Sequence, residues 1–406
     1  MPNVTFYFEV HQPYRLKRVY SFIEDKEFID VDKNREIFNK VADKCYIPMT
    51  KLLISLAKKH PEFKVNFSLT GVFMEQAEMF RPEVITLFQE LFDTGSMELL
   101  SETYYHSLSY LLDKGEFVEQ VKMHKSLMYH YFKFHPKIFR NTEALYSNDI
   151  ANTVAKMGYN GIIAEGWDRI LGWRSPNYVY MNPENSIKVL LRNYKLSDDV
   201  AFRFSTPTWN EFPLTADKYS NWISNNEGTT VNLFMDYETF GEHQWKETGI
   251  FDFMTDLPGK LISKGVGFNK VSEAIKPKAV GAVDVPYYLS WADMDRDLSA
   301  WLGNKMQDAA FKKLKEIQRE VMLSKNKELI KRWRILQTSD NFYYMCTKWF
   351  ADGDIHKYFN AYSSPYVAYL NYMNIISQLD STIKSFLMLR RRPAYKPEEI
   401  FPSQTD

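Results

Sequence analysis

The first two-thirds of this chain alternates short apolar runs with amphipathic segments, and this alternation limits the possible folds more than any other feature. Seven apolar runs have the length of strands: 4–10, 64–69, 97–100, 137–142, 161–164, 188–192 and 230–235. Several are followed by segments with helical spacing of apolar residues, such as 48–60, 82–91, 116–134 and 148–157. Strands followed by helices predict an α/β fold with a parallel sheet. Seven such repeats favour a closed or nearly closed, distorted (β/α)7 barrel.

The pattern changes after about Trp291. Residues 305–322, 327–336 and 365–389 have helical spacing, and no strand-like run separates them. At 406 residues the chain is also too long for one ordinary compact domain. We therefore predict a barrel domain over residues 1–285 and a helical domain over residues 286–406, packed on the barrel rim.

Charge and cysteine content narrow the class of protein. Lys plus Arg and Asp plus Glu both number 51, so the formal net charge is zero, and nucleic acid is not expected as a partner. No apolar run is long enough to predict a membrane span, and the first residues do not resemble a signal peptide. Cys45 and Cys346 are far apart, which predicts neither a disulfide framework nor a cysteine metal site. These features favour a cytoplasmic protein without cofactor or metal.

Two of the strand-like runs end in a carboxylate, namely Glu143 and Asp236. In a β/α barrel, the C-terminal ends of the strands carry the chemistry. A pair of carboxyl groups is what cleavage of a glycosidic bond requires: one protonates the leaving oxygen, and the other attacks or stabilises the sugar cation. From the residues alone, either carboxylate can take either role. His11 and Gln12 follow the first strand and belong to the same end of the barrel.

Five short motifs occur in order along the chain. They are His11-Gln12-Pro13, Gly95-Ser-Met-Glu98 with the following His106, Arg140-Asn-Thr-Glu143, Asp236-Tyr-Glu238-Thr-Phe-Gly241-Glu-His243-Gln-Trp245, and Gln337-Thr-Ser-Asp340. Together they resemble the motifs of glycoside hydrolase family 57, which contains α-amylases, 4-α-glucanotransferases and branching enzymes that act on α-glucans. Departures in the third and fourth motifs are typical of its α-amylase-like branch.

The resemblance implies a seven-stranded β/α barrel with a helical C-terminal domain. It also implies an α-glucan substrate and cleavage with retention by double displacement, without a cofactor. By resemblance, Glu143 is the nucleophile and Asp236 the general acid/base. The expected substrate-binding residues are His11, Gln12, Glu98, His106, Trp209, Glu238, His243, Trp245 and Asp340.

Several finer expectations remain open at this point. Trp209, Trp245 and Trp291 are candidates for stacking on glucose rings, with core packing as the alternative. Glu238 and His243 either orient Asp236 and contact substrate or serve loop structure. Arg140 would help to keep Glu143 ionised, but residues i and i+3 of a strand point to opposite faces, so we expect no direct contact.

Three rival functions bear on the interpretation. A metal-dependent polysaccharide deacetylase would need an Asp-His-His site, but the closely spaced histidines 124, 130 and 135 belong to a predicted helix or its end. A non-catalytic glucan-binding protein would have less need of both carboxylates. Within the enzymes, we expect an α-amylase before a 4-α-glucanotransferase, and both before a branching enzyme. The sequence does not show whether water or a second sugar accepts the glycosyl group.

Overall fold

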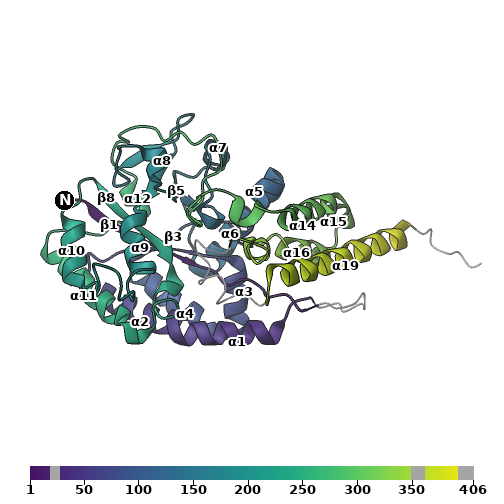
Figure 1. Ribbon diagram of the computed structural model, residues 1–406, viewed down its shortest axis with the longest axis horizontal. Coiled ribbons are helices and arrows are strands. Elements are labelled where there is room, and N and C mark those ends of the chain that lie inside the picture. The colour runs from purple at the N-terminus through teal and green to yellow at the C-terminus, as the bar shows by residue number, and fades with distance from the viewer. Residues whose placement is uncertain (19–27, 349–361, 392–406) are drawn as a thin grey trace, which may run out of the picture.

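A computed structural model describes residues 1–18, 28–348 and 362–391, and its centre is a barrel of short strands surrounded by helices (Figure 1). The strands of this described part are β1 (Asn3–Val10), β2 (Val65–Leu69), β3 (Met97–Leu99), β4 (Ile138–Arg140), β5 (Gly161–Glu165), β6 (Val179–Met181), β7 (Lys188–Arg192) and β8 (Thr230–Asp236). Seven of them correspond to the seven predicted strands, with ends that differ by up to two residues.

The strands form two four-stranded sheets with the orders β3-β2-β1-β8 and β4-β5-β7-β6. All pairings within them are parallel, except that β6 runs antiparallel to β7. Backbone hydrogen bonds join the sheets at both seams: Ser101 bonds with β4 on one side, and the N–H of Asn193 donates to the C=O of Asn232 (2.9 Å) on the other. Seven parallel strands thus close into the distorted barrel that the sequence predicts.

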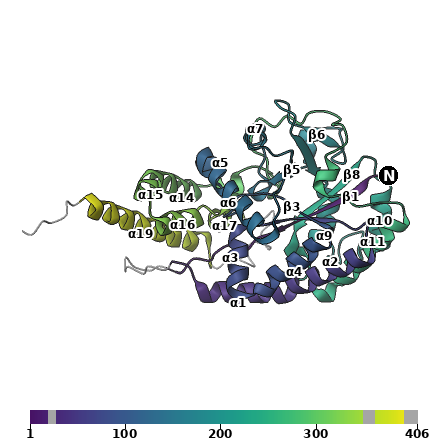
Figure 2. The ribbon, with the colours of Figure 1, turned by 180° about the vertical axis from the view of Figure 1, so that it is seen from behind.

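The helices between the strands cover the outside of the barrel (Figures 1 and 2). Local signals fix several of their starts: Pro82 opens one helix, and the side chains of Asp113 and Ser147 cap two others by accepting backbone N–H groups. The helices of this part are α1 (Val31–Val41), α2 (Ile47–Lys59), α3 (Gly71–Phe80), α4 (Pro82–Asp93), α5 (Ser109–Leu112), α6 (Lys114–Phe132), α7 (Asn148–Lys156), α8 (Asp168–Leu171), α9 (Tyr194–Ala201), α10 (Ala216–Ser224), α11 (Ile250–Ser263) and α12 (Val271–Ala274).

The stretch between the strands at 161–164 and 230–235 contains more regular structure than its sequence predicts. Besides β7, this stretch contains the antiparallel strand β6 and the helices α8, α9 and α10. These elements are three to nine residues long. Elements of this length are too short for apolar periodicity to stand out among the many Trp, Pro and Asn residues.

A second group of helices extends to one side of the barrel, as Figure 2 shows from behind. It comprises α13 (Ser299–Leu302), α14 (Lys305–Glu316), α15 (Gln318–Ser324), α16 (Lys327–Ile335), α17 (Ser339–Tyr343) and α19 (Pro365–Arg391). Trp333 and Ile376 from these helices belong to the same buried hydrophobic cluster as Ile162 of β5 and Val189 of β7. The helical region therefore shares a core with the second sheet, while the domain boundary at 285/286 stays a prediction.

The inside of the barrel has two layers that follow from the alternation of side chains along a strand. The lower layer is apolar and contains Tyr7, Leu100, Ile138, Ile163, Leu190 and Phe234. Two residues further along each of these chain segments comes a charged residue: Glu9, Glu102, Arg140, Glu165, Arg192 and Asp236. These charged residues form a second layer at the C-terminal ends of the strands, the mouth of the barrel, and the candidate site lies there.

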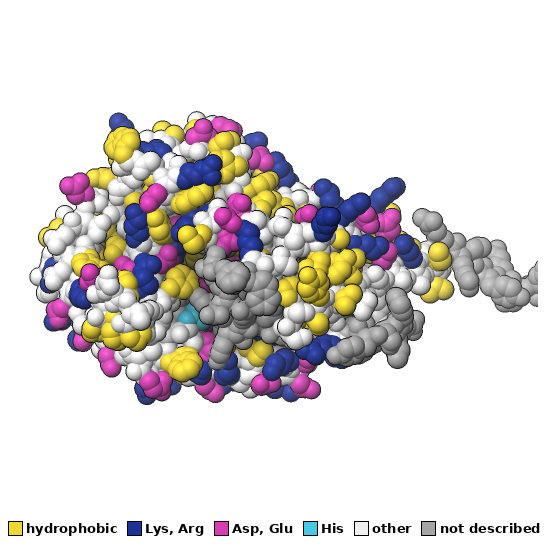
Figure 3. Space-filling view, viewed as in Figure 1, with side chains coloured by type: hydrophobic (Ala, Val, Ile, Leu, Met, Phe, Trp, Pro, Cys, Tyr) yellow, Lys and Arg dark blue, Asp and Glu magenta, His cyan; other side chains and the backbone are white. Residues whose placement is uncertain are grey.

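The outer surface is mixed in character. On the face that Figure 3 shows, basic and acidic side chains are interspersed, as equal numbers of the two would lead one to expect. None of the helices in the described ranges is both long enough and apolar enough to cross a membrane.

Candidate active site

Glu143 lies in a tight 3₁₀ turn, η2 (Thr142–Ala144), directly after β4. Both Glu143 (φ 55°) and Ala144 (φ 50°) have left-handed backbone conformations, which non-glycine residues adopt at a cost. The carboxylate is held at both oxygens: the indole N–H of Trp291 donates to Oε2 (3.0 Å), and the hydroxyl of Ser339 donates to Oε1 (3.0 Å). These donors stabilise the ionised form and fix its orientation.

Both donors come from chain segments that follow the barrel strands, and backbone pairing places them. Leu289 pairs with Tyr146, so the segment leading to Trp291 runs beside the turn that carries Glu143. The backbone N–H of Ser339 donates to the C=O of His106 (2.9 Å), which ties the start of α17 to the loop after β3. The helical region therefore completes the surroundings of Glu143.

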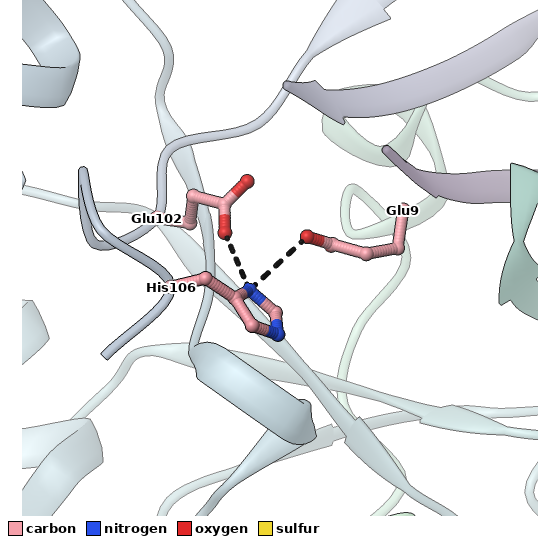
Figure 4. Close-up of side chains that lie close together, drawn as sticks. All are labelled: Glu9, Glu102 and His106. Atoms are coloured by element: carbon pink, nitrogen blue, oxygen red, sulfur yellow. Dashed lines mark hydrogen bonds and ion pairs between the residues drawn. The ribbon is translucent and has the colours of Figure 1, made fainter. Parts of the chain in front are cut away.

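His106, in the loop after β3, is buried among carboxylates (Figure 4). Its Nε2 lies 3.4 Å from Oε1 of Glu143, while its Nδ1 lies 3.3 Å from Oε2 of Glu102 and 3.4 Å from Oε1 of Glu9. Burial alone would lower the pKa of His106, but these three carboxylates outweigh it and raise the pKa to about 10. The imidazole is therefore a cation at neutral pH.

Asp236 is the last residue of β8 and points into the mouth of the barrel, two residues after Phe234 of the apolar layer. Burial, followed by repulsion from Glu143 and Glu9, raises the pKa of Asp236 to about 7. Arg140 and His106 oppose this rise. A carboxyl group that keeps its proton close to neutral pH can act as a general acid.

His11, directly after β1, forms a second polar cluster beside His106. Its Nε2 lies 3.0 Å from Oδ2 of Asp340, its Nδ1 lies 3.0 Å from the hydroxyl of Thr70, and its ring stacks on that of His106 at 4.1 Å between centroids. Burial and the neighbouring cation of His106 lower the pKa of His11. A neutral His11 beside an ionised Asp340 offers hydrogen-bonding groups suited to sugar hydroxyls.

Arg140 points into the site, although residues i and i+3 of a continuous strand would face opposite sides. Its guanidinium lies 3.2 Å from Oε2 of Glu9 and 4.7 Å from the centre of the Trp291 ring. The expectation assumed a continuous strand from Arg140 to Glu143, but β4 ends at Arg140 and the chain then turns. Arg140 and His106 together hold the pKa of Glu9 below its ordinary value despite its burial.

Two adjoining hollows meet at the candidate carboxyl pair. Glu143, Asp236, His243 and Trp291 line both of them. The larger hollow continues past arginines and exposed apolar side chains, and the smaller one is lined by polar groups from the first and last motifs. The larger includes Arg192, Phe202, Arg203, Met294 and Arg296, and the smaller includes Glu9, His11, Gln12, His106, Glu238 and Asp340.

One group in the described part of the chain has the composition of a metal site. Ligand atoms of Glu9, Glu102 and His106 lie within 4.8 Å of one another. Arg140, however, lies against Glu9, and the two carboxylates share the Nδ1 side of a protonated imidazole. This donor set fits a proton better than a metal ion, and it is not the Asp-His-His set of a deacetylase.

Comparison with known proteins identifies the family. The profile described as "Glycosyl hydrolase family 57" matches residues 5–290. A protein of Methanocaldococcus jannaschii, named provisionally as an α-amylase, is 45% identical over 400 residues, which cover 95% of this chain and 85% of that protein. The chain belongs to glycosyl hydrolase family 57. Cleavage with retention is general for family 57, and the chain is accordingly a retaining glycoside hydrolase.

Two solved structures of family 57 enzymes share the fold. A branching enzyme from Pyrococcus horikoshii has a TM-score of 0.69 at 17% identity, over 96% of this chain and 91% of that one. A 4-α-glucanotransferase from Thermococcus litoralis has a TM-score of 0.65 at 16% identity, over 84% of this chain and 56% of that one. At these identities the likeness supports the (β/α)7 barrel and the helical C-terminal region.

Most of the residues in the family 57 motifs come together. His11, Gln12, His106, Glu238, His243 and Asp340 all line the hollows next to Glu143 and Asp236. Gln12 accepts a hydrogen bond from Arg15 (3.0 Å), and Glu238 accepts one from the hydroxyl of Tyr46 (2.5 Å). Burial and repulsion from Asp236 raise the pKa of Glu238 well above its ordinary value.

Glu98, by contrast, lies outside the cluster. It pairs with Asn66 near the start of β2, and its Oε2 accepts the backbone N–H of Ser272 (2.9 Å) at the opposite end of the barrel. The physical reason is that β3 has only three residues, so the chain must continue to Glu102 before it reaches the mouth. Glu98 matches the family 57 motif in the sequence, but its position along β3 places it away from the mouth of the barrel.

Two tryptophans also lie away from the hollows. Trp209 packs against the core of the first sheet and meets Trp222 edge to face, and Trp245 is 55% exposed with Lys44 over its ring. Neither residue lines the hollows that meet at Glu143 and Asp236. Trp291 is at the site, but as the hydrogen-bond donor to Glu143 rather than as a free stacking face.

Sequence reasoning missed Glu102 and Ser339. A signal for Glu102 was present, because it follows the inward-facing Leu100 by two residues, as Asp236 follows Phe234. Ser339 stands beside Asp340 in the fifth motif, but a serine on a short helix carries no signal that it will reach a carboxylate in the barrel.

Proposed function

We propose that this family 57 protein hydrolyses α-1,4-glucans, with Glu143 as the nucleophile and Asp236 as the general acid/base. The observation that carries the proposal is the contrast between the two carboxyl groups. Glu143 receives donors at both oxygens, and the pKa of Asp236 is raised to about 7. Such a contrast supports the assignment of the ionised role to one group and the protonated role to the other.

In the first step, Asp236 gives its proton to the glycosidic oxygen while Oε1 or Oε2 of Glu143 attacks the anomeric carbon. The bond from that carbon to the leaving oxygen breaks, and a covalent glycosyl ester forms. In the second step, Asp236 takes a proton from a water molecule, whose oxygen attacks the same carbon and releases Glu143 as a carboxylate. Two inversions leave the configuration unchanged.

The α-glucan substrate is inferred from the relatives and from the shape of the site. The relatives are a protein named provisionally as an α-amylase, a branching enzyme and a 4-α-glucanotransferase. The two hollows on either side of the carboxyl pair leave room for sugar units on both sides of the bond. His11 and Asp340 supply hydrogen-bonding groups to the smaller hollow.

The test is the product profile from maltoheptaose, followed together with the number of reducing ends. We expect reducing ends to rise while products become shorter. Longer and shorter oligomers at a constant number of reducing ends would identify a glucanotransferase instead. Unchanged maltoheptaose would contradict the substrate assignment.

Two glutamate variants make this test specific to the proposed site. Glu143→Gln should lower kcat by more than about a thousandfold, because the amide cannot form the ester intermediate. Glu98→Gln is a matched control, since Glu98 is also buried but lies at the other end of the barrel. Comparable losses in both variants would contradict the proposed site.

The cellular location is proposed on chemical grounds alone. Cys45 and Cys346 are both free thiols, and Cys45 is buried. A chain with two unpaired cysteines is compatible with a reducing compartment such as the cytoplasm.

A further inference from the structure

Glu102 is a fully buried carboxyl group at the mouth of the barrel, and the mechanism above does not use it. It follows the inward-facing Leu100 by two residues, and its Oε2 lies 3.3 Å from Nδ1 of His106 (Figure 4). Its backbone N–H points to His124, which in turn bonds to the C=O of Leu69. These contacts anchor the backbone of Glu102, and its side chain is not among those that line the two substrate hollows.

The geometry around His106 requires a proton on each ring nitrogen. Nδ1 faces carboxylate oxygens of Glu102 and Glu9, and Nε2 faces a carboxylate oxygen of Glu143. In a neutral imidazole, one nitrogen would present a lone pair to a carboxylate, which is repulsive in a buried site. A doubly protonated ring donates on both sides.

We propose that Glu102 is a positioning residue: it accepts the Nδ1 proton of His106 and so holds the ring as a cation whose Nε2–H is directed at Glu143. The proposal concerns the site of the proposed function and rests on Glu143 being the nucleophile. Glu9 is less able to fill this role, because Glu102 makes a hydrogen bond with Nδ1, whereas Oε1 of Glu9 lies near Nδ1 without the geometry of a hydrogen bond.

The charges that surround His106 come from several elements and support this assignment. Besides Glu102, the groups that act on His106 or are acted on by it are Glu9 of β1, Asp236 of β8, Glu143 of η2, Asp340 of α17 and His11. Arg140 lies against the Glu9 carboxylate. Burial and repulsion from Glu9 raise the pKa of Glu102 to about 8. Below that pH Glu102 is neutral, and its carbonyl oxygen still accepts the Nδ1 proton of His106. Above that pH Glu102 is a carboxylate, and its negative charge keeps His106 protonated.

The consequence for catalysis lies at the second step. A cation that donates to Oε1 of Glu143 stabilises the carboxylate that departs when water attacks the glycosyl ester. Without Glu102, His106 would lose its proton at lower pH, and this stabilisation would disappear in the alkaline range.

The direct test is the protonation state of His106, followed by NMR of histidine-labelled protein without substrate. Comparison with His106→Asn assigns the resonances. In the wild type we expect both ring nitrogens to remain protonated at about pH 9. In Glu102→Gln we expect the midpoint to fall by at least about one pH unit, because the anion is absent.

Two further variants separate charge from structure. Glu102→Asp retains the carboxylate, so its His106 midpoint should lie between those of Glu102→Gln and the wild type. It also replaces Glu102→Gln in the test if that variant does not fold. Glu98→Gln, a buried glutamate outside the site, should leave the His106 midpoint unchanged. An unchanged midpoint in Glu102→Gln, or an equal change in Glu98→Gln, would overturn the proposal.

The kinetic test uses a substrate whose first step is fast, so that kcat reports the second step. At alkaline pH, Glu102→Gln should lower kcat roughly tenfold while changing kcat/KM little. A uniform loss in both parameters would indicate a structural role only. The NMR test needs no turnover. It can therefore contradict the role of Glu102 without affecting the proposed hydrolysis, and it can support that role even if maltoheptaose is not the substrate.

A metal ion is the competing occupant of this cluster, and zinc titration of the wild type distinguishes it. We expect the His106 signals to be unaffected by equimolar zinc. Stoichiometric zinc binding, with a change in the Nδ1 chemical shift that is absent in Glu102→Gln, would show that the cluster holds a metal ion instead of a proton. That result would overturn the proposal.

Discussion

At the level of single residues, Glu143 and Asp236 are both carboxyl groups, and their neighbouring side chains make them different. Donors from Trp291 and Ser339 hold the Glu143 carboxylate, whereas Asp236 lies among other carboxyl groups. The sequence predicted the pair but not this difference, because the donors come from chain segments about 150 and 200 residues away from Glu143.

The pH dependence of the first step should follow Asp236. Its pKa is raised to about 7, so the group is protonated below that pH and loses the proton as pH rises through it. The kcat/KM for maltoheptaose should therefore fall on the alkaline side with a midpoint of about 7. Asp236→Asn should lower it by on the order of 10²- to 10⁴-fold.

An aryl α-maltoside with a good leaving group is the control for this prediction. Its departure needs no proton, so the alkaline fall in kcat/KM should disappear, and Asp236→Asn should lose far less activity on this substrate. The same alkaline fall with both substrates would assign the titration to another group.

The contrast between Glu98 and Glu102 shows where residue-level prediction reached its limit. Both lie near β3 and both are buried, but only one is at the mouth. A motif match gives only the order of residues along the chain. The position of a residue along the barrel axis depends on where its strand begins and ends. In β3 that range is three residues, which is within the usual error of boundaries predicted from sequence.

At the level of elements, the sequence predicted the seven strands of the parallel barrel and missed the short antiparallel strand β6. β1 and β8 were found nearly residue for residue, because both are long and buried along most of their length. β6 was missed because it has three residues and lies at a sheet edge. The 3₁₀ turn that presents Glu143 could not be foreseen either, since left-handed Glu and Ala have no sequence signal.

Ala144→Gly tests whether this turn stores strain. Glycine adopts φ near 50° freely, so the substitution should leave the free energy of unfolding unchanged or raise it by up to about 1 kcal/mol. It should also loosen Glu143 and lower kcat roughly three- to tenfold. Thermal unfolding and initial rates measure the two effects.

The matched control is Ala155→Gly in the helix α7, where the backbone is right-handed. There the same substitution should cost about 1 kcal/mol of stability without an effect on kcat. If Ala144→Gly destabilised the protein as much as Ala155→Gly, the turn would not be strained.

At the level of the whole molecule, the barrel and the helical region depend on one another. They share a buried cluster that includes Val189 of β7 and Trp333 of α16. The sequence predicted two domains from the change in pattern, which was a sound guide to secondary structure. It could not reveal the shared cluster, because apolar positions do not indicate their partners.

Trp333→Ala should therefore destabilise the entire protein. Trp333 is fully buried and its indole N–H donates to the C=O of Leu314 (3.0 Å), so truncation should cost about 3–5 kcal/mol. Calorimetry should show a single transition at a lower Tm, with activity lost in the same range. Trp173→Ala, at a site that is 95% exposed, should leave the Tm unchanged. Two separate transitions would indicate independent units.

The positions of Trp291 and Ser339 in the chain bear on how the enzyme is made. Synthesis proceeds from the N-terminus, and N-terminal parts generally fold first. Glu143 and Asp236 emerge early, but the groups that hold Glu143 are translated later, and Ser339 last of all. Before then, Glu143 lacks these donors, and the barrel lacks the part of its core that the helical region supplies. The surroundings of Glu143 are therefore completed late in synthesis, after Ser339 has been translated.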